Sequence, residues 1–290
     1  MNTRPPTVGL LHPGEMGAAV GGSLRECAVE VLWVGRGRSS ATRDRAPAAG
    51  LTEVDSLALL LHASSIVFSI CPPGAAPEVA NQVVPAGFAG VYVEVNAISP
   101  ATALAIQDRL RRRGATFVDG AIIGAPPEPG GDTSLYLSGT GAETVADLFE
   151  GSGRLRVRVL EGPVGAASAL KMCYAAWSKG STALLLAVRA AAAGLGVDEA
   201  LLAEWELSQP GLGRRFSSIQ NSTPRKAWRF VAEMEQIAET LEAVGVPGDS
   251  TERRPPSSPG WPNSRIRSRD PAWTSCSTHC EIRRSRKARR

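Results

Sequence analysis

The sequence has few histidines and cysteines, and this limits the chemistry that it can support. Its three histidines lie far apart, at positions 12, 62 and 279, so they provide little for a histidine-based triad or a histidine-rich metal site. The cysteines of the first 249 residues have no paired spacing, which predicts reduced thiols rather than disulfides. Cys276, His279 and Cys280 fall short of the four ligands of a structural zinc site. We expect no bound metal.

Long apolar runs are also absent. The longest uncharged stretch, residues 56–77, is interrupted by Ser64, Ser65, Pro72 and Pro73, and it predicts a helix followed by a strand rather than a membrane span. The N-terminus leads directly into a strand without the pattern of a secretory signal. We therefore expect a cytoplasmic protein without a membrane partner.

Basic charge is scarce outside the C-terminal tail. The whole chain has a formal net charge of +4, but residues 250–290 hold 11 of the 32 Lys and Arg and only 3 of the 28 Asp and Glu. The first 249 residues thus carry a net charge of −4. A role in nucleic-acid binding would depend on the tail alone, so we expect no nucleic-acid partner. The tail has five prolines, two Ile, no Leu and no Val, a composition that cannot bury a core.

The stretch from Val8 to Leu24 predicts an apolar strand, a turn that contains glycine, and a helix with apolar residues at helical spacing. This pattern is typical of a dinucleotide-binding unit. Gly14 and Gly17 would let the backbone approach a pyrophosphate at the helix N-terminus. His12 and Pro13 occupy the place of the usual first glycine. The alternative is that these glycines serve packing only. If the unit binds a dinucleotide, the turn residues that contact it are His12, Pro13, Gly14, Glu15 and Met16.

A basic cluster follows the second predicted strand, Val29 to Val34. Its members are Arg36, Arg38, Ser39, Ser40 and Arg43. At this place an acidic residue binds a free ribose 2′-hydroxyl, whereas arginine accommodates a 2′-phosphate. The cluster contains no carboxylate, so it favours NADP as cofactor, through Arg36, Ser39 and Arg43. A solvated basic loop is the alternative.

Strands and helices alternate along the first half of the chain. We predict helices over 57–61, 76–84 and 100–113, the last capped by Ser99 with Pro100 in its first turn, and strands over 66–70, 91–95, 116–119, 134–138 and 155–160. This alternation predicts an α/β fold, a Rossmann-type doubly wound parallel sheet whose ligands gather at the carboxyl ends of its strands. Those ends include Cys71 to Gly74 and Asn96 to Ser99.

A long helix should follow, because residues 164–193 are rich in Ala and Leu and lack proline; its length would be about 45 Å. Further helices are predicted over 197–206 and 224–244. The expected domains are an NADP-binding Rossmann domain (1–163), an interdomain helix with a small all-α C-terminal domain (164–249), and a tail (250–290). We expect the tail to be disordered, or to result from a frameshift near Pro247.

Several segments together resemble the β-hydroxyacid dehydrogenases and 6-phosphogluconate dehydrogenase. The segments are VGLLHPGEMG, CPPG, EVNAISPAT, FVDGAIIGAPP with LYLSG, and GPVGAASALKM, in that order. The chain looks most like a poorly characterised branch of that superfamily with a short helical C-terminal domain, and DGAIIGAP also resembles the imine reductases. The resemblance covers Val8 to Pro247.

The resemblance implies roles for individual residues. Gly14, Met16 and Gly17 match the phosphate turn, and Arg36 the 2′-phosphate site. Cys71, Pro72 and Pro73 match the loop beside the cofactor. Asn96 matches a residue near the nicotinamide and the substrate, and Lys171 matches the general acid and base. The substrate-binding positions of the family correspond to Asn96 and Ile123, and Tyr174, adjacent to a third such position, could act as a hydrogen-bond donor. Packing in the core is the alternative for Tyr174.

Lys171 also suits this role physically, because a partly buried ammonium of lowered pKa can protonate the heteroatom that forms after hydride transfer. A lysine on a wet helix face is the alternative. The family's usual serine is replaced by Ile123, and its usual asparagine by Ala175 with Tyr174 adjacent, so a typical small β-hydroxyacid is a doubtful substrate.

The sequence thus predicts an NADP-dependent oxidoreductase that acts on a small alcohol or carbonyl compound. Imine reduction and non-catalytic NADPH binding remain alternatives. We also expect a homodimer, because so small a helical domain buries little surface by itself.

Overall fold

The computed structural model describes residues 6–222 and 230–248. The chain divides into two units, residues 1–253 and 254–290, and all described residues belong to the first. The expectations for the tail, and for a helix start at Thr223 and Pro224, lie outside the described residues.

An eight-stranded sheet forms the centre of the first unit, in the order β3-β2-β1-β4-β5-β6-β7-β8. The strands are β1 (Val8–Leu10), β2 (Val31–Val34), β3 (Thr52–Val54), β4 (Ile66–Ser69), β5 (Val91–Glu94), β6 (Thr116–Ile123), β7 (Ser134–Ser138) and β8 (Arg156–Val159). Neighbouring strands are parallel except for β6 and β7. These two strands are antiparallel because only a loop, without a crossover helix, joins them.

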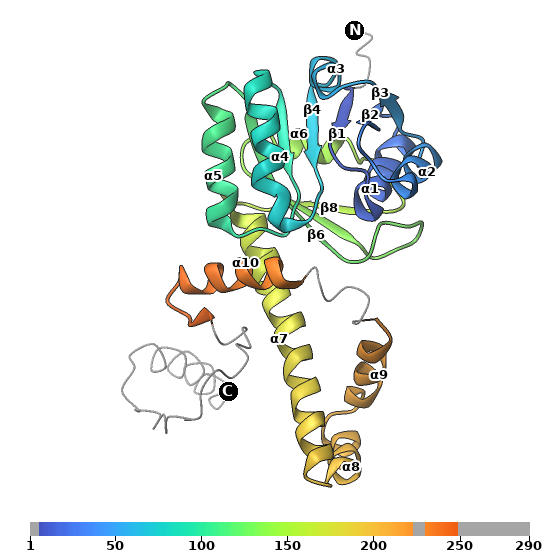
Figure 1. Ribbon diagram of the computed structural model, residues 1–290, viewed down its shortest axis with the longest axis vertical. Helices are drawn as coiled ribbons and strands as arrows, with labels where there is room; N and C mark the ends of the chain where they lie inside the picture. Colours follow the sequence, from blue (N-terminus) through green and yellow to red (C-terminus); the bar gives the residue numbers. More distant parts are fainter. Residues whose placement is uncertain (1–5, 223–229, 249–290) are drawn as a thin grey trace, which may run out of the picture. The chain divides into compact units, whose positions relative to one another are not determined.

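Helices cover both faces of the sheet (Figure 1). They are α1 (Glu15–Glu26), α2 (Ser40–Ala48), α3 (Leu57–Ala63), α4 (Ala76–Val83), α5 (Pro100–Arg111) and α6 (Ala142–Asp147), with short 3₁₀ turns η1 (Pro73–Ala75) and η2 (Val84–Ala86). One core holds Leu24 of α1 and Val145 of α6, and the other holds Leu60 of α3, Val79 of α4 and Ile106 of α5. This two-faced arrangement confirms the predicted doubly wound fold.

The N-terminus of α5 confirms the predicted cap. Ser99 Oγ accepts a hydrogen bond from Thr102 N at 3.0 Å, and Pro100 occupies the first turn. Conversely, α2, β3, α6 and the helix α9 (Leu212–Ser222) were not predicted. Helix α2 begins inside the segment interpreted as a basic loop, because Ser39 Oγ accepts from Thr42 N at 3.3 Å and caps it.

The long helix α7 (Ala166–Gly194) has 29 residues. It is followed by α8 (Asp198–Ser208), α9 (Leu212–Ser222) and α10 (Phe230–Glu242). Met172 and Ala175 of α7 pack with Ile237 of α10 in a small core. Gln236 and Glu239 of α10 accept hydrogen bonds from Ser99 N and Oγ at 2.7 and 2.5 Å. Within the described ranges, no helix has both the length and the apolar character needed to cross a membrane.

Candidate active site

Three adjoining pockets lie at the carboxyl ends of the strands. The arginine pocket, of about 280 Å³, lies beside the end of β2 and contains Arg36 and Arg38. The turn pocket, of about 340 Å³, lies over the β1–α1 turn and contains Pro13 and Gly14. The lysine pocket, of about 400 Å³, contains Lys171. Shared lining residues connect them in this order, as a bound dinucleotide would require.

The two glycines of the β1–α1 turn, Gly14 and Gly17, are needed for different reasons. A Cβ on Gly17 would lie 2.3 Å from the backbone oxygen of His12, so only glycine lets α1 begin this close to the turn. A Cβ on Gly14 would meet nothing within 4 Å, because Gly14 borders the open space of the turn and lysine pockets. The first glycine therefore leaves room for a ligand, and the second closes the turn.

His12 is uncharged at neutral pH. Burial, and secondarily the nearby Arg38 guanidinium, lower the pKa of His12 to about 4. Its Nδ1 is buried and has no hydrogen-bond partner among the residues that the structure describes. Arg38 Nη2 donates to Leu11 O at 3.1 Å, and its buried Nε also lacks such a partner. Two buried nitrogens at this turn are therefore unpaired within the described part of the chain.

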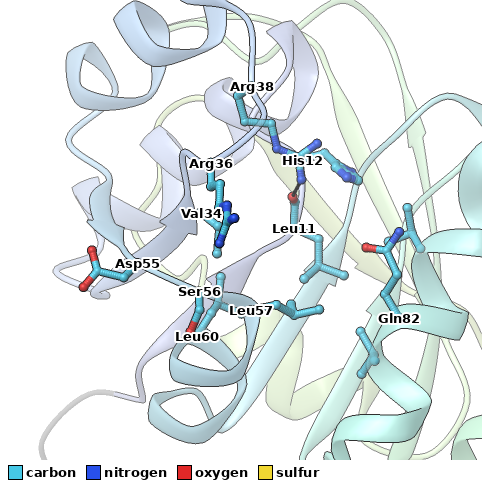
Figure 2. A pocket seen from close by; sticks show the side chains of 12 residues that line it. Leu11, His12, Val34, Arg36, Arg38, Asp55, Ser56, Leu57, Leu60 and Gln82 are labelled. Carbon is cyan, nitrogen blue, oxygen red and sulfur yellow. Dashed lines mark hydrogen bonds between the residues drawn. The ribbon is translucent and has the colours of Figure 1, made fainter.

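The predicted basic cluster separates into two groups. Arg36 and Arg38 line the arginine pocket, and Figure 2 shows Arg36 extending into its middle while the Asp55 carboxylate points away from it. Ser39 is occupied as the cap of α2, and Arg43 is exposed on that helix. The structure brings neither Ser39 nor Arg43 into any of the three pockets.

Asn96 holds the Cys71-Pro72-Pro73 loop in place rather than pointing a free amide at a substrate. Its Oδ1 accepts from Cys71 N at 2.5 Å, and its Nδ2 donates to Ser69 Oγ at 3.0 Å and to Glu94 Oε1. All three residues of the loop and Asn96 line the lysine pocket. The side-chain amide is thus used within the protein, and Asn96 acts by positioning the loop.

Glu94 is a fully buried carboxyl group that the sequence analysis missed. Its Oε1 accepts from Asn96 N at 3.0 Å, whereas its Oε2 has no partner among the described residues. Burial raises the pKa of Glu94 to about 8, against the opposing effect of the hydrogen bonds from Asn96 and Ser69. Glu94 is therefore largely protonated at neutral pH.

Lys171 reaches the lysine pocket from the second turn of α7. Its Nζ donates to the backbone oxygen of Ile122, at the end of β6, at 2.8 Å. Burial lowers the pKa of Lys171, Glu233 raises it, and Lys179 lowers it. Glu233 of α10 also lines the pocket, and its Oε1 forms an ion pair with Lys179 Nζ at 2.6 Å. The pocket therefore combines an ammonium of lowered pKa with a carboxylate beside it.

The start of α7 is anchored to the sheet by Asp119. Its Oδ2 accepts from Gly165 N at 3.0 Å, Ser168 N at 2.9 Å and Ser138 Oγ at 3.1 Å. Its Oδ1 accepts from Ser168 Oγ at 2.6 Å. Ala167 N donates to Ser138 Oγ at 3.1 Å. The first backbone N–H groups of α7 are thus satisfied by strands β6 and β7, which fixes the direction from which Lys171 enters the pocket.

Of the predicted site residues, ten line the lysine or turn pocket, and five line neither: Arg36, Ser39, Arg43, Ile123 and Tyr174. Those in the two pockets are His12, Pro13, Gly14, Glu15, Met16, Cys71, Pro72, Pro73, Asn96 and Lys171. Ile123 is absent from the lining, where its neighbours Ile122 and Gly124 lie instead. Tyr174 is 50% exposed and lies outside the lining. Glu233 was missed, because only the packing of α10 on α7 brings it to the pocket.

Comparison with known proteins supports this view of the fold. A family model described as a domain of unknown function, DUF1932, matches residues 192–253. An uncharacterised 28.5 kDa protein in the 7S RNA 5′ region of Methanothermus fervidus is 30% identical over 235 residues, which cover 81% of this chain and 88% of that protein. The conserved protein MTH1747, of unknown function and structurally similar to 3-hydroxyacid dehydrogenases, is 32% identical, with a TM-score of 0.66 over 83% of this chain and 91% of that chain.

Two more distant structures share the fold alone. Mycobacterium tuberculosis 3-hydroxyisobutyrate dehydrogenase, solved with L-serine, has a TM-score of 0.66 at 16% identity, over 86% of this chain and 92% of that chain. An imine reductase variant from Myxococcus stipitatus, solved with NAD⁺, has a TM-score of 0.59 at 19% identity, over 75% and 78% of the two chains.

The fold is that of the NAD(P)-binding dehydrogenases and reductases, with structural similarity to the 3-hydroxyacid dehydrogenase and imine reductase superfamily. Within it, the chain belongs to the family of the uncharacterised Methanothermus fervidus protein and carries a DUF1932 segment at its C-terminal side.

Proposed function

We propose that this protein is an NADP-dependent oxidoreductase that interconverts an alcohol and a carbonyl compound, with Lys171 as general acid and base. The observation that carries the proposal is the position of Lys171 Nζ, which is held by Ile122 O at 2.8 Å in a pocket bordered by the β1–α1 turn and the Cys71-Pro72-Pro73 loop. A proton donor thus lies beside the place where this fold binds a nicotinamide.

The residues present suit NADP. Gly14 leaves open space at the N-terminus of α1, and His12 and Arg38 line both the arginine pocket and the turn pocket. Arg36 lies in the arginine pocket, where a 2′-phosphate requires a cation. The loop of Cys71, Pro72 and Pro73, held by Asn96, would border the nicotinamide.

When bound, the nicotinamide cofactor supplies or accepts the hydride. In the reductive direction, Lys171 Nζ donates its proton to the oxygen of the carbonyl group whose carbon receives the hydride; in the oxidative direction, neutral Lys171 removes the hydroxyl proton. Burial lowers the pKa of Lys171, which makes both protonation states accessible nearer to neutral pH. Pro72, Pro73 and Ile122 give the pocket apolar walls.

The test combines cofactor binding with turnover. Lys171→Met should retain the wild-type Kd for NADPH but lose turnover by about 100-fold or more in a screen of carbonyl compounds, since general acid–base catalysis typically contributes about 10²–10⁴-fold. Lys171→Arg, which keeps the charge but cannot cycle its proton, should be similarly impaired. Unchanged turnover in both variants would contradict the assignment and favour a different proton donor.

Imine reduction is the second candidate, and two departures from the family pattern together with one pocket side chain favour it. Ile123 and Ala175 replace the serine and asparagine that would bind a hydroxyacid, and Glu233 supplies a carboxylate that disfavours an acidic substrate. Parallel assays with cyclic imines and with 3-hydroxyacids distinguish the two reactions. NADPH binding without turnover of either class would instead indicate a binding protein.

We also propose that the protein is a homodimer that packs along α7. Four large apolar side chains of α7 and that of its C-cap residue are exposed and share one face of the helix: Tyr174, Trp177, Leu184, Val188 and, at the C-cap, Leu195. Their stripe runs for about 32 Å at 1.5 Å per residue, and such apolar surfaces usually mark an interface. Light scattering should give the mass of two chains for the wild type, and of one chain for Trp177→Asp with Leu184→Asp. Glu199→Gln, an exposed change on α8, is the control.

A further inference from the structure

Arg36 and Arg38 are two residues apart but line different spaces. Arg36 lines the arginine pocket alone, whereas Arg38 lines both that pocket and the turn pocket. The turn pocket also contains Pro13, Gly14 and Pro72, so it adjoins the N-terminus of α1. The two arginines can therefore contact different parts of one extended ligand.

Arg38 is held over the β1–α1 turn by the protein itself. Its Nη2 donates to Leu11 O, the backbone oxygen that follows β1, at 3.1 Å (Figure 2). Its Nε is buried and has no partner among the described residues, and the same holds for His12 Nδ1. Burial lowers the pKa of Arg38, but an arginine remains charged at physiological pH. The turn thus carries an oriented cation that lines both the arginine pocket and the turn pocket.

The turn needs such a cation because its own backbone offers few donors. Pro13 has no N–H group, and Gly14 N already donates to His12 O at 2.9 Å. Glu15 places a carboxylate in the first turn of α1, where it opposes the binding of an anion. The N–H groups at the start of α1 must therefore attract a phosphate without hydrogen-bond donors from the preceding turn, and against repulsion by the Glu15 carboxylate.

We propose that Arg38 binds the pyrophosphate of the cofactor, which NADPH and NADH share, and that it compensates for the donors that His12 and Pro13 remove from the turn. Arg36 binds only the 2′-phosphate. This inference rests on the proposed function, since it requires that the three pockets bind a nicotinamide dinucleotide.

The experiment measures the Kd of NADPH and of NADH by fluorescence titration for the wild-type chain, Arg36→Gln and Arg38→Gln. Arg43→Gln, an exposed arginine of α2 outside the pockets, is the matched control. We expect Arg38→Gln to raise both Kd values by the same factor, about 10- to 100-fold for the loss of a charge-assisted contact. Arg36→Gln should raise the Kd of NADPH alone. Calorimetry with 2′-AMP, which lacks a pyrophosphate, should show weaker binding in Arg36→Gln and unchanged binding in Arg38→Gln.

An increase confined to NADPH in Arg38→Gln would overturn the inference and make Arg38 a second 2′-phosphate residue. Unchanged Kd values for both nucleotides would overturn it as well. If Arg38→Gln does not fold, as judged by circular dichroism, Arg38→Lys is measured instead. Lysine keeps the positive charge but lacks the planar guanidinium group that can donate two parallel hydrogen bonds. We therefore expect a smaller increase in Kd, by the same factor for NADPH and NADH. A wild-type chain that binds neither nucleotide would refute the proposed function, and this inference with it.

Discussion

Asp119 and Ser168 join the sheet to the long helix, because Asp119 Oδ1 accepts a hydrogen bond from Ser168 Oγ at 2.6 Å while Oδ2 accepts from Ser168 N at 2.9 Å. Both side chains are fully buried. Lys171 lies three residues further along α7, so the position of its ammonium depends on this contact.

Asp119→Ala should destabilise the fold strongly, because it leaves the buried N–H groups of Gly165 and Ser168 without acceptors. We expect a loss of about 1–3 kcal/mol for each unpaired buried group. Ser168→Ala removes one hydroxyl group and should cost about 1 kcal/mol. Urea unfolding measures both changes. Ser178→Ala on the same helix, whose hydroxyl donates to Ala175 O within α7 itself, is the control. An equal loss of stability there would contradict the anchoring role.

Gly17→Ala should damage the β1–α1 turn, because its Cβ would lie 2.3 Å from the backbone oxygen of His12. We expect a lower free energy of unfolding and weaker NADPH binding. Gly22→Ala in the same helix is the matched control, since its Cβ would lie 3.8 Å from the nearest atom, and alanine favours a helix over glycine by about 1 kcal/mol. Thermal unfolding of both variants checks the prediction, which fails if both become more stable.

Glu94→Gln should change how stability depends on pH. The pKa of Glu94 is raised to about 8 in the folded protein, from an unfolded value of about 4.3. The folded state therefore binds more protons between these values, and wild-type stability falls as pH rises through this window. The neutral glutamine removes that dependence. We expect the Tm of the variant to exceed that of the wild type at pH 9 by more than at pH 5, with roughly 2–4 °C for each kcal/mol in a domain of this size. Parallel Tm curves would disprove the assignment.

Glu233→Gln should lower the pKa of Lys171, because the Glu233 carboxylate raises it. In the reductive direction the rate requires protonated Lys171, so the fall in rate at high pH should begin at lower pH in this variant. Lys179→Met should move the same limb to higher pH, since Lys179 lowers the pKa of Lys171. Both variants break the ion pair between residues 179 and 233, so pH–rate profiles that shift in the same direction would show a structural effect instead.

Much of the fold could be predicted from local patterns. The β1–α1 unit, the Ser99 cap and the extent of α7 follow from apolar periodicity, glycine placement and capping residues, which act within a few residues of the chain. Helix α2 was missed because a polar, arginine-rich helix has little apolar periodicity. The full length of β6 was missed because its second half is stabilised by antiparallel pairing with β7.

The sequence by itself determined the doubly wound architecture, the glycine turn, the basic segment after β2 and the single lysine of an apolar helix start. Only the tertiary structure decided that Asn96 is bound by Cys71 and Glu94, that Tyr174 faces outward, and that Glu233 meets Lys171. The physical reason is the separation along the chain between the residues that interact. Helices and turns depend on neighbours along the chain, whereas Asn96 meets Cys71 only when β4 and β5 pair, and Glu233 reaches the lysine pocket only when α10 packs against α7.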